Sequence, residues 1–333
     1  MSRARTARRI ATAAAYGGGG LSALGGAVTA LLVAEAKLAR RWVGEPVGSP
    51  PVTDGLYGHG DGAPLSLAML GDSSAAGLGV DDPHRTPGVR LAAGLGEATG
   101  RPVRLTSVAV VGARSDDLDA QVTRALVARP DVAVVMIGAN DVTHRVRPST
   151  SVRYLDHAVR RLRAAGAQVV VGTCPDLGTV EPIAQPLRLV ARRWSRQLAA
   201  AQTIAVVEAG GRSVSLGDVL GPEFAAEPRL MFGPDRFHPS ADGYASCAAV
   251  LLPSACAALG IPRDEEAEPE PFRGEGVLPV AMAAVEAADE AGTEVAATQV
   301  AGRDRGPRGR WALLRHRRRR PLPEAETIEG PAS

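Results

Sequence analysis

The sequence predicts a doubly wound α/β fold, in which helices cover both faces of a parallel sheet. Between residues 65 and 207, short apolar runs rich in β-branched residues alternate with segments long enough to form helices. The runs lack the polar alternation of half-exposed strands, which is typical of parallel strands buried on both faces. Five strands are expected, at residues 65–70, 103–110, 132–137, 168–172 and 203–207.

The segments between these runs are expected to form the covering helices. Four such helices are expected, at residues 87–99, 115–128, 151–165 and 187–201. A last helix should begin after Ser240, because serine is a favoured N-cap residue, and should run toward Leu259. Pro253 is expected to disturb that helix, since proline removes a backbone hydrogen bond.

The bulk composition indicates a globular protein without a nucleic-acid partner. The chain has 333 residues, of which 45% are hydrophobic and 22% charged, a balance that suits a packed core. Arginines crowd both ends while the middle is nearly balanced, so the net charge of +2 does not indicate a general nucleic-acid surface. Aromatic residues make up only 3%, too few for the stacking on which single-stranded nucleic-acid binding depends.

The cysteines favour neither a disulfide framework nor a metal site. There are three, Cys174, Cys247 and Cys256, and their spacing matches no zinc motif. Cys247 and Cys256 should lie on opposite faces of the last helix, because nine residues at about 100° each separate them by half a turn. We expect all three to be small buried hydrophobic residues, and we expect no metal and no cofactor.

The N-terminal part of the chain is expected to be separate from the globular domain. Residues 1–43 begin with four arginines and then carry no charge until Glu35. In order of preference, this segment is an uncleaved membrane anchor, a cleaved export signal or a soluble arm, since about 20 apolar residues cross a bilayer. Residues 44–64 are rich in Gly, Pro, Ser and Asp and are expected to be a linker.

Residues 65–262 are expected to form the catalytic domain, and residues 263–333 a mainly disordered tail with at most one weak helix near 279–291. The tail is acidic and proline-bearing at first, then alanine-rich, and almost entirely basic at residues 315–320. That basic cluster could attract anionic lipid or nucleic acid, although a solvated tail is the preferred interpretation.

A candidate nucleophile stands at the end of the first expected strand. The apolar run 65–70 stops at Gly71-Asp72-Ser73, and small residues able to start a helix follow. In open α/β folds, ligands bind at the carboxyl edge of the strands, so Ser73 is well placed to react. The same tripeptide is also an ordinary turn, so other residues must support the assignment.

A candidate base and its partner occur just before the last helix. Asp235 stands three residues before His238, close enough to reach the imidazole nitrogen that faces away from a nucleophile. Pro239 restricts His238 to extended conformations. Alone, the pair would rather indicate a surface loop, because Asp-x-x-His is common by chance. His144 is a weaker candidate base, because no carboxylate stands at a comparable distance on a separate loop.

Two further strand ends carry groups that could stabilise an oxyanion. Gly112 follows the second strand and would let a backbone amide approach a ligand closely. Asn140 follows the third strand and can donate its side-chain amide without carrying charge. Gly112 as a turn glycine and Asn140 as part of a helix cap are plausible alternatives. Together with Ser73 and His238, however, they would gather at one edge of the sheet.

These four segments resemble the blocks of the SGNH subgroup of GDSL-type serine hydrolases. The matching stretches are Gly71-Asp72-Ser73 with Gly77, then Gly112, Gly138-Ala139-Asn140-Asp141, and Asp235-Arg236-Phe237-His238-Pro239. The order and spacing of these stretches agree with those of the family across about residues 65–259. The departure is Ser107, where many relatives have asparagine, and it leaves the local support of that loop open.

The resemblance implies a three-layer α/β/α sandwich with a five-stranded parallel, flavodoxin-like sheet. It implies that Ser73 is the nucleophile, His238 the base and Asp235 the residue that orients His238. The amides of Ser73 and Gly112 and the side chain of Asn140 would form the oxyanion hole. The expected activity is hydrolysis of carboxylic acyl esters through an acyl-enzyme. The alternatives are an acyltransferase on the same triad and an inactive, membrane-tethered binding protein.

The substrate and the setting of the reaction stay open at this stage. The pocket walls would come from the loops 77–87, 174–188 and 220–237, and the segment 174–186 is either a lid or an ordinary loop. A small-molecule or lipid ester is expected, with lipid or cell-envelope esters favoured by the N-terminal segment. The same segment favours a membrane-associated or exported protein, and the oligomeric state is undetermined.

Overall fold

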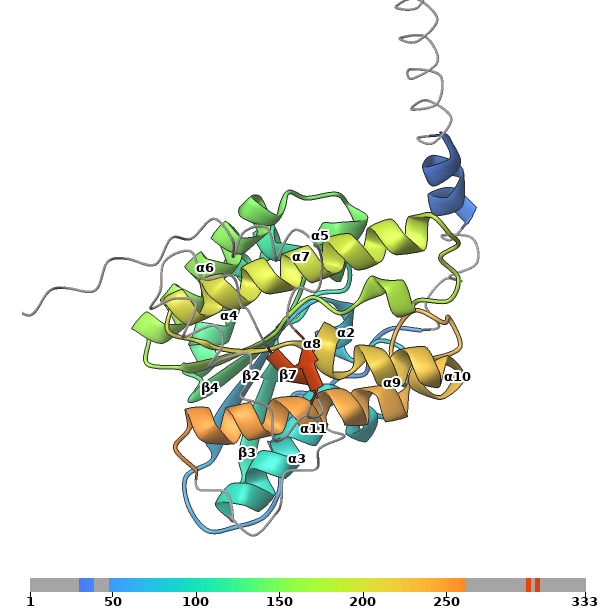
Figure 1. Cartoon of the computed structure of the whole chain (residues 1–333). Helices are drawn as coiled ribbons and strands as arrows, with labels where there is room; N and C mark the ends of the chain where they lie inside the picture. Colours follow the sequence, from blue (N-terminus) through green and yellow to red (C-terminus); the bar gives the residue numbers. More distant parts are fainter. Residues whose placement is uncertain (1–29, 39–47, 262–297, 301–302, 306–333) are drawn as a thin grey trace, which may run out of the picture.

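The computed structural model describes residues 30–38, 48–261, 298–300 and 303–305. A central sheet lies between two layers of helices (Figure 1), with the strand order β1-β3-β2-β4-β5-β6. The strands are β1 (Gly55–Tyr57), β2 (Leu65–Gly71), β3 (Val103–Ser107), β4 (Val132–Met136), β5 (Gln168–Gly172) and β6 (Arg212–Val214). The strands β3-β2-β4-β5-β6 are parallel, in the flavodoxin-like order that places the first of them second, and β1 is antiparallel to β3.

Long helices cover both faces of the sheet, so the predicted three-layer fold is confirmed. One layer contains α4 (Leu118–Ala125), α6 (Pro148–Ala164) and α7 (Leu187–Glu208), and the other contains α3 (Pro87–Thr99) and α11 (Ala241–Ala258) (Figure 1). Shorter helices are α2 (Ser73–Ala76), α5 (Ala139–Thr143), α8 (Leu216–Val219), α9 (Gly221–Ala226) and α10 (Pro228–Met231). Single 3-10 turns occur at Pro83–Arg85, Ser115–Asp117, Leu126–Ala128 and Leu177–Thr179.

The central strand β2 is anchored on both faces. Its side chains alternate, so that Leu67 and Met69 join the core on the α3 and α11 side, while Ala68 and Leu70 join the core on the α4 and α6 side. All four are completely buried. Full burial of a side chain such as Leu67 contributes roughly 1.5–3 kcal/mol. The end of β2, where Ser73 stands, therefore has a rigid support.

Two expectations for the sheet were wrong in detail. The run 203–207, expected as a strand, belongs to α7, and the fifth parallel strand is β6. Thr203 and Val206 are buried on one side of α7, because a short apolar run fits a buried helix as well as a buried strand. The sheet also has a sixth strand, β1, which lies inside the segment 44–64 expected as a linker.

The last helix begins where expected, but the disturbance expected at Pro253 is absent, because α11 runs unbroken through that residue. Ser240 caps α11, since its hydroxyl accepts hydrogen bonds from the amides of Asp242 and Gly243 at 3.2 Å each, and Pro253 lies inside the helix. All three cysteines are buried and free.

Most of both chain ends lies outside the described residues. The disorder expected for residues 263–333 therefore stays a prediction. Within that range, β7 (Thr298–Val300) and β8 (Arg303–Arg305) form a separate antiparallel pair. Near the other end, residues 30–38 are helical. No helix in the described ranges is both long enough and apolar enough to span a membrane.

Candidate active site

The sharp turn from β2 into α2 presents Ser73 at the carboxyl edge of the sheet. Gly71 has φ +133°, and a Cβ there would stand 1.9 Å from the carbonyl oxygen of Met136, so only glycine fits. Asp72 then caps α2, because its carboxylate accepts a hydrogen bond from the amide of Ser74 at 2.9 Å. Ser73 is the first residue of this helix.

The structure brings Ser73, His238 and Asp235 into one hydrogen-bonded chain. Nδ1 of His238 lies 2.5 Å from Oδ2 of Asp235, and Nε2 lies 2.9 Å from Oγ of Ser73. An ionised carboxylate only accepts hydrogen bonds, so Nδ1 carries the proton and neutral His238 accepts from the Ser73 hydroxyl. Each of the three residues is only 7% exposed. These three hydrogen-bonded side chains are therefore shielded from bulk water.

A short loop holds Asp235 in position for His238. Its Oδ1 accepts hydrogen bonds from the amides of Phe237 and His238, at 3.0 Å each. Burial raises the pKa of Asp235, but the hydrogen bonds from His238 and from these two amides outweigh burial and leave the pKa below its usual value. Asp235 is therefore charged at neutral pH and can stabilise a protonated His238.

Asp72 is a second buried carboxyl group near the same histidine. Burial raises its pKa to about 6, although the amide of Ser74 and the charge of His238 oppose the rise. The carboxylate of Asp72 accepts a hydrogen bond at the start of α2, whereas that of Asp235 accepts the hydrogen bond that Nδ1 of His238 donates. The two acids thus differ in both partner and pKa.

Gly112 and Asn140 come close together at the neighbouring strand ends. Gly112 lies after β3 with φ +81°, and a Cβ there would meet open space. Asn140 is in α5, and its Nδ2 donates a 3.0 Å hydrogen bond to the carbonyl of Ala113, the residue after Gly112. A side-chain amide has two protons, so the second one is available to a ligand.

The loop that carries Gly112 has an additional support. Ser107 stands where many relatives have asparagine. The backbone amide of Ser107 donates a 2.7 Å hydrogen bond to Oδ1 of Asp54. Asp54 directly precedes β1, so the edge strand also contributes to the site.

Two buried glutamines complete the site, and sequence reasoning missed both. Gln121 of α4 accepts a hydrogen bond from the amide of Gly71 at 2.7 Å and donates to its carbonyl at 2.9 Å. Gln202 of α7 accepts from the amide of Cys174 at 2.7 Å and donates to the carbonyl of Ile137 at 3.0 Å. A signal existed: each glutamine stands on the buried stripe of an amphipathic helix, where an apolar residue is usual.

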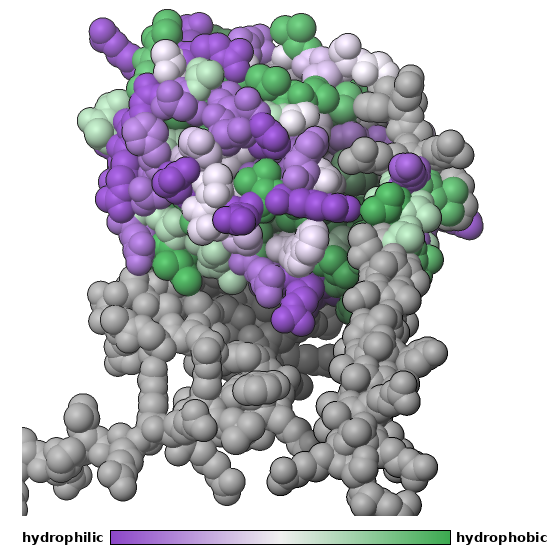
Figure 2. Space-filling view, turned by 90° about the horizontal axis from the view of Figure 1, so that it is seen from above, coloured by the Kyte–Doolittle hydropathy of each residue, from purple (hydrophilic) through white to green (hydrophobic). Residues whose placement is uncertain are grey.

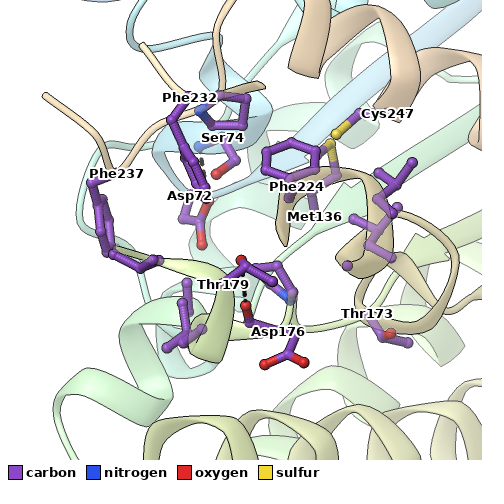
Figure 3. Close-up of a pocket in the computed structure, with 18 of the residues that line it drawn as sticks. Asp72, Ser74, Met136, Thr173, Asp176, Thr179, Phe224, Phe232, Phe237 and Cys247 are labelled. Atoms are coloured by element: carbon purple, nitrogen blue, oxygen red, sulfur yellow. Dashed lines mark hydrogen bonds between the residues drawn. The ribbon is translucent and has the colours of Figure 1, made fainter. Parts of the chain in front are cut away.

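An apolar pocket with a volume of about 80 Å³ lies between the strand ends and the segments that follow them (Figure 3). Figure 3 shows Asp72 and Phe237 at one end, and Met136, Phe224 and Cys247 at the other. The walls come from the strand ends and from the segments 175–180 and 216–239. The lining residues are Asp72, Ser74, Met136, Ile137, Ala139, Thr173, Pro175, Asp176, Leu177, Thr179, Val180, Leu216, Leu220, Gly221, Phe224, Phe232, Phe237, Pro239 and Cys247.

Three features of the pocket bear on its use. Its lining includes residues next in sequence to Ser73, Asn140 and His238, although those three residues are not themselves part of the lining. The expected walls 174–188 and 220–237 both contribute, whereas the loop 77–87 does not. The hydroxyl of Thr173 is buried in the wall without a hydrogen-bond partner among the described residues.

Comparisons with known proteins show what this chain is similar to. Residues 69–246 match the GDSL-like lipase/acylhydrolase family. The chain is 44% identical over 260 residues to the GDSL-like esterase Rv1075c of Mycobacterium tuberculosis, covering 74% of this chain and 82% of the relative. It is also similar to the crystal structure of TesA, with 19% identity, 58% of this chain and 99% of the other covered, and a TM-score of 0.48. A catalytic mutant of Axe2, an acetylxylan esterase from Geobacillus stearothermophilus, is 18% identical, with 63% of this chain and 99% of the other covered and a TM-score of 0.46.

Proposed function

This chain belongs to the GDSL-like lipase/acylhydrolase family, and we propose that it hydrolyses carboxylic esters with Ser73 as nucleophile, His238 as base and Asp235 as the orienting acid. The family match and the relative named an esterase support ester hydrolysis. The observation that carries the proposed roles is the unbroken hydrogen-bond chain from Asp235 through His238 to the Ser73 hydroxyl.

The first half of the reaction forms an acyl-enzyme. Oγ of Ser73 attacks the carbonyl carbon of the ester while Nε2 of His238 accepts the hydroxyl proton. The bond between the carbonyl carbon and the alcohol oxygen then breaks, and His238 donates its proton to the leaving alcohol. Asp235 is already charged and stabilises the imidazolium that exists between the two proton transfers.

The second half releases the acid. A water molecule attacks the acyl-enzyme while His238 accepts one of its protons, and the same proton then returns to Oγ of Ser73 as the acid leaves. In both halves, negative charge develops on the carbonyl oxygen. The amides of Ser73 and Gly112 and Nδ2 of Asn140 are the proposed donors to it, and a single donor of this kind is worth about 3–4 kcal/mol.

The pocket supports a preference for short acyl chains. Its walls are mainly aliphatic and aromatic, and they include the residues on either side of Ser73 and of His238 in the sequence. An apolar cavity of about 150 Å³ accepts benzene, so the 80 Å³ here leaves room for roughly three or four carbon atoms. We therefore propose that the acyl group occupies this pocket, and that propionyl or butyryl esters are preferred over octanoyl esters.

Replacement of the nucleophile tests the reaction, with p-nitrophenyl acetate, butyrate and octanoate as substrates. Ser73→Ala should lose at least a thousandfold in kcat while its circular dichroism and melting temperature stay near those of the wild type. Ser66→Ala, at the opposite end of β2 and outside the pocket lining, is the matched control and should stay active. Equal turnover by the Ser73→Ala variant would overturn the role of Ser73.

A pocket variant tests the acyl-length preference separately. Leu220 is 6% exposed and lines the pocket, so Leu220→Ala should shift the preferred ester toward longer chains. Leu230 is 50% exposed and does not line it, so Leu230→Ala should leave the preference unchanged. An unaltered preference in an active, folded Leu220→Ala protein would place the acyl chain elsewhere.

Two other functions use the same residues differently. A transferase would pass the acyl group from Ser73 to an alcohol, so product analysis with an added alcohol should detect a new ester instead of free acid alone. A binding protein without turnover would leave Ser73 unreactive toward a fluorophosphonate probe. Stoichiometric labelling of Ser73 in the wild type, absent in Ser73→Ala, is the result expected of an active enzyme.

A further inference from the structure

Three arginines stand at intervals of four residues along α7, which places them in one row on the helix: Arg188, Arg192 and Arg196. All three reach residues 175–183, here called the wall segment, whose first part lines the pocket. Arg188 donates to two carbonyls near the end of the wall segment, and Nη2 of Arg192 donates to the carbonyl of Gly178 at 3.2 Å. The row therefore fastens the wall segment to the helix at several points.

Asp176 is the residue at which two of these arginines meet. Its Oδ2 accepts hydrogen bonds from Nε and Nη2 of Arg196 at 3.2 and 3.1 Å, and it lies 3.4 Å from Nε of Arg192. The side chain of Asp176 is only 2% exposed, whereas those of Arg192 and Arg196 are 43% and 52% exposed. A buried carboxylate depends on such partners, because an unpaired charge is costly to keep away from water.

The backbone of the wall segment is bound to the same carboxylate and to α7. Oδ1 of Asp176 accepts a 2.8 Å hydrogen bond from the amide of Gly178, and the amide of Leu177 donates to Oγ of Ser195 at 3.3 Å. Gly178 lies directly against Arg192, since a Cβ on Gly178 would stand 2.6 Å from the Cβ of Arg192. The wall segment and α7 are therefore in close contact at this point.

The arginines act on the wall segment from outside the pocket. Figure 3 shows the carboxylate of Asp176 pointing away from Met136 and Phe224. Figure 2, a view of the face formed by α6 and α7, shows many hydrophilic residues in purple there. Neither Arg192 nor Arg196 is among the lining residues of the pocket. Their contribution to the pocket therefore passes through the wall segment.

Two neighbouring elements keep the wall segment in place. A Cβ at Gly217 of α8 would stand 3.1 Å from the backbone nitrogen of Asp176, so the wall segment lies between α7 and α8. Helix α7 is itself anchored at its start, where Oε2 of Glu35 accepts a 2.8 Å hydrogen bond from the amide of Leu187. That bond satisfies one of the amides that a helix leaves free at its first turn.

We propose that Arg192 and Arg196 are positioning residues that hold the wall segment against α7 and so limit the length of the acyl chain that the pocket accepts. A lid that opens for substrate has few buried contacts, whereas Asp176, Leu177 and Gly178 are all buried. Of the two alternatives for residues 174–186, the fixed loop is therefore favoured over the lid. The limit on acyl length rests on the proposed function, because it places the acyl group in this pocket.

Loss of both arginines leaves the charge of Asp176 buried without its partners. The carboxylate should then move toward water, and the wall segment should move with it. The pocket becomes larger, so esters with longer acyl chains can enter. Ser73 and His238 belong to other segments, the start of α2 and the loop before α11, so their reactivity should persist.

The double variant Arg192→Met/Arg196→Met tests the proposal, with p-nitrophenyl butyrate and octanoate as substrates. The ratio of kcat/KM for octanoate to that for butyrate should rise at least tenfold, because one methylene group in an apolar pocket already changes kcat/KM about tenfold or more. Phosphonylation of Ser73 by a small fluorophosphonate should stay close to the wild-type rate. Arg193→Met is the matched control, because Arg193 is exposed on the same helix, and it should leave the ratio unchanged.

Hydrogen exchange gives a second measurement that does not depend on turnover. The amides of Leu177 and Gly178 should exchange slowly in the wild type and at least tenfold faster in the double variant. If the double variant does not fold, Arg196→Met alone should show both changes to a smaller extent, since Arg192 remains beside Asp176.

Three results would overturn the proposal. The first is an unchanged ester ratio in a folded, active double variant, and the second is unchanged exchange at Leu177 and Gly178. The third is an equal loss of kcat for both esters with slow phosphonylation, which would show that the arginines support the catalytic groups instead. If the wild type hydrolyses no ester, the proposed function fails, whereas faster exchange in the double variant would still support the fixed wall.

Discussion

Gln121 holds the backbone of Gly71 with two hydrogen bonds, one to its amide and one to its carbonyl. Gly71 stands two residues before Ser73, so a side chain from α4 fixes the turn that presents the nucleophile. The carbonyl of Gly71 also accepts a 3.1 Å hydrogen bond from the amide of Val110, whereas Gln121 is the acceptor for the Gly71 amide. The position of the Ser73 hydroxyl thus depends on a residue 48 positions later in the sequence.

Gln121→Leu should therefore impair both stability and turnover. It leaves the buried amide of Gly71 unpaired, which costs roughly 1–3 kcal/mol in the free energy of unfolding, while the Gly71 carbonyl keeps its bond from the amide of Val110. We expect kcat to fall about 10- to 100-fold while KM changes little, because a displaced nucleophile affects the reaction more than binding. Urea unfolding and steady-state kinetics measure the two effects. Gln197→Leu, an exposed glutamine on α7, is the control, and an unchanged kcat in folded Gln121→Leu would contradict the positioning role.

Asp72→Asn should stabilise the protein at neutral pH. The folded state raises the pKa of Asp72 from 3.8 to about 6, so the folded protein binds its proton more tightly than the unfolded chain does. This contribution favours folding below pH 4 and is lost as the pH rises through 6. The corresponding cost at pH 7 is about 3 kcal/mol, which an uncharged asparagine avoids while still accepting the bond from Ser74.

The difference in unfolding free energy between Asp72→Asn and the wild type is the relevant measurement. It should approach its maximum above pH 7 and become small near pH 4, since the other titrating groups contribute equally to both proteins. If the difference in unfolding free energy stays constant between pH 4 and pH 7.5, the negative charge of Asp72 does not destabilise the folded state.

Thr173→Val should stabilise the pocket wall. Its hydroxyl is buried without a described partner, and valine has nearly the same shape without the polar atom. We expect a gain of about 1–2 kcal/mol in unfolding free energy and a lower KM for butyryl esters.

Thr203→Val is the matched control for the pocket threonine. The hydroxyl of Thr203 is also buried, but it lies 3.0 Å from the carbonyl of Ala199 and 3.1 Å from Oγ of Ser213. Its loss should destabilise the protein by about 1 kcal/mol. If Thr173→Val destabilises by as much, the Thr173 hydroxyl must be bound to an ordered water molecule.

Glu35→Ala should release the N-terminal helix from α7. The amide of Leu187 loses its acceptor, so its hydrogen exchange and that of residues 30–38 should become faster. The loss of such a cap costs about 1 kcal/mol. Glu35→Gln keeps an acceptor oxygen and should restore slow exchange. Identical exchange in the wild type and Glu35→Ala would show that the helix is held by its other contacts.

Much of the fold could be predicted because local patterns determine it. The runs that form β4 and β5 are short, apolar and rich in valine, that of β2 is short and mostly apolar, and helix α3 matches its expected range. The run 203–207 was misassigned because a short, mostly apolar run fits a buried helix as well as a buried strand. β1 and β6 have only three residues each, too few for a periodic signal.

The sequence alone determined which residues were available for the site. Glycines, a serine, an asparagine and an Asp-x-x-His follow strands or precede a helix in an order that a parallel sheet gathers at one edge. Only the tertiary structure decided the geometry: the 2.5 and 2.9 Å contacts of His238, the two glutamines that support strand ends, the lining of the pocket and the contact of Glu35 with Leu187. The physical reason is that hydrogen bonds and burial between distant segments depend on packing, which local sequence patterns do not encode.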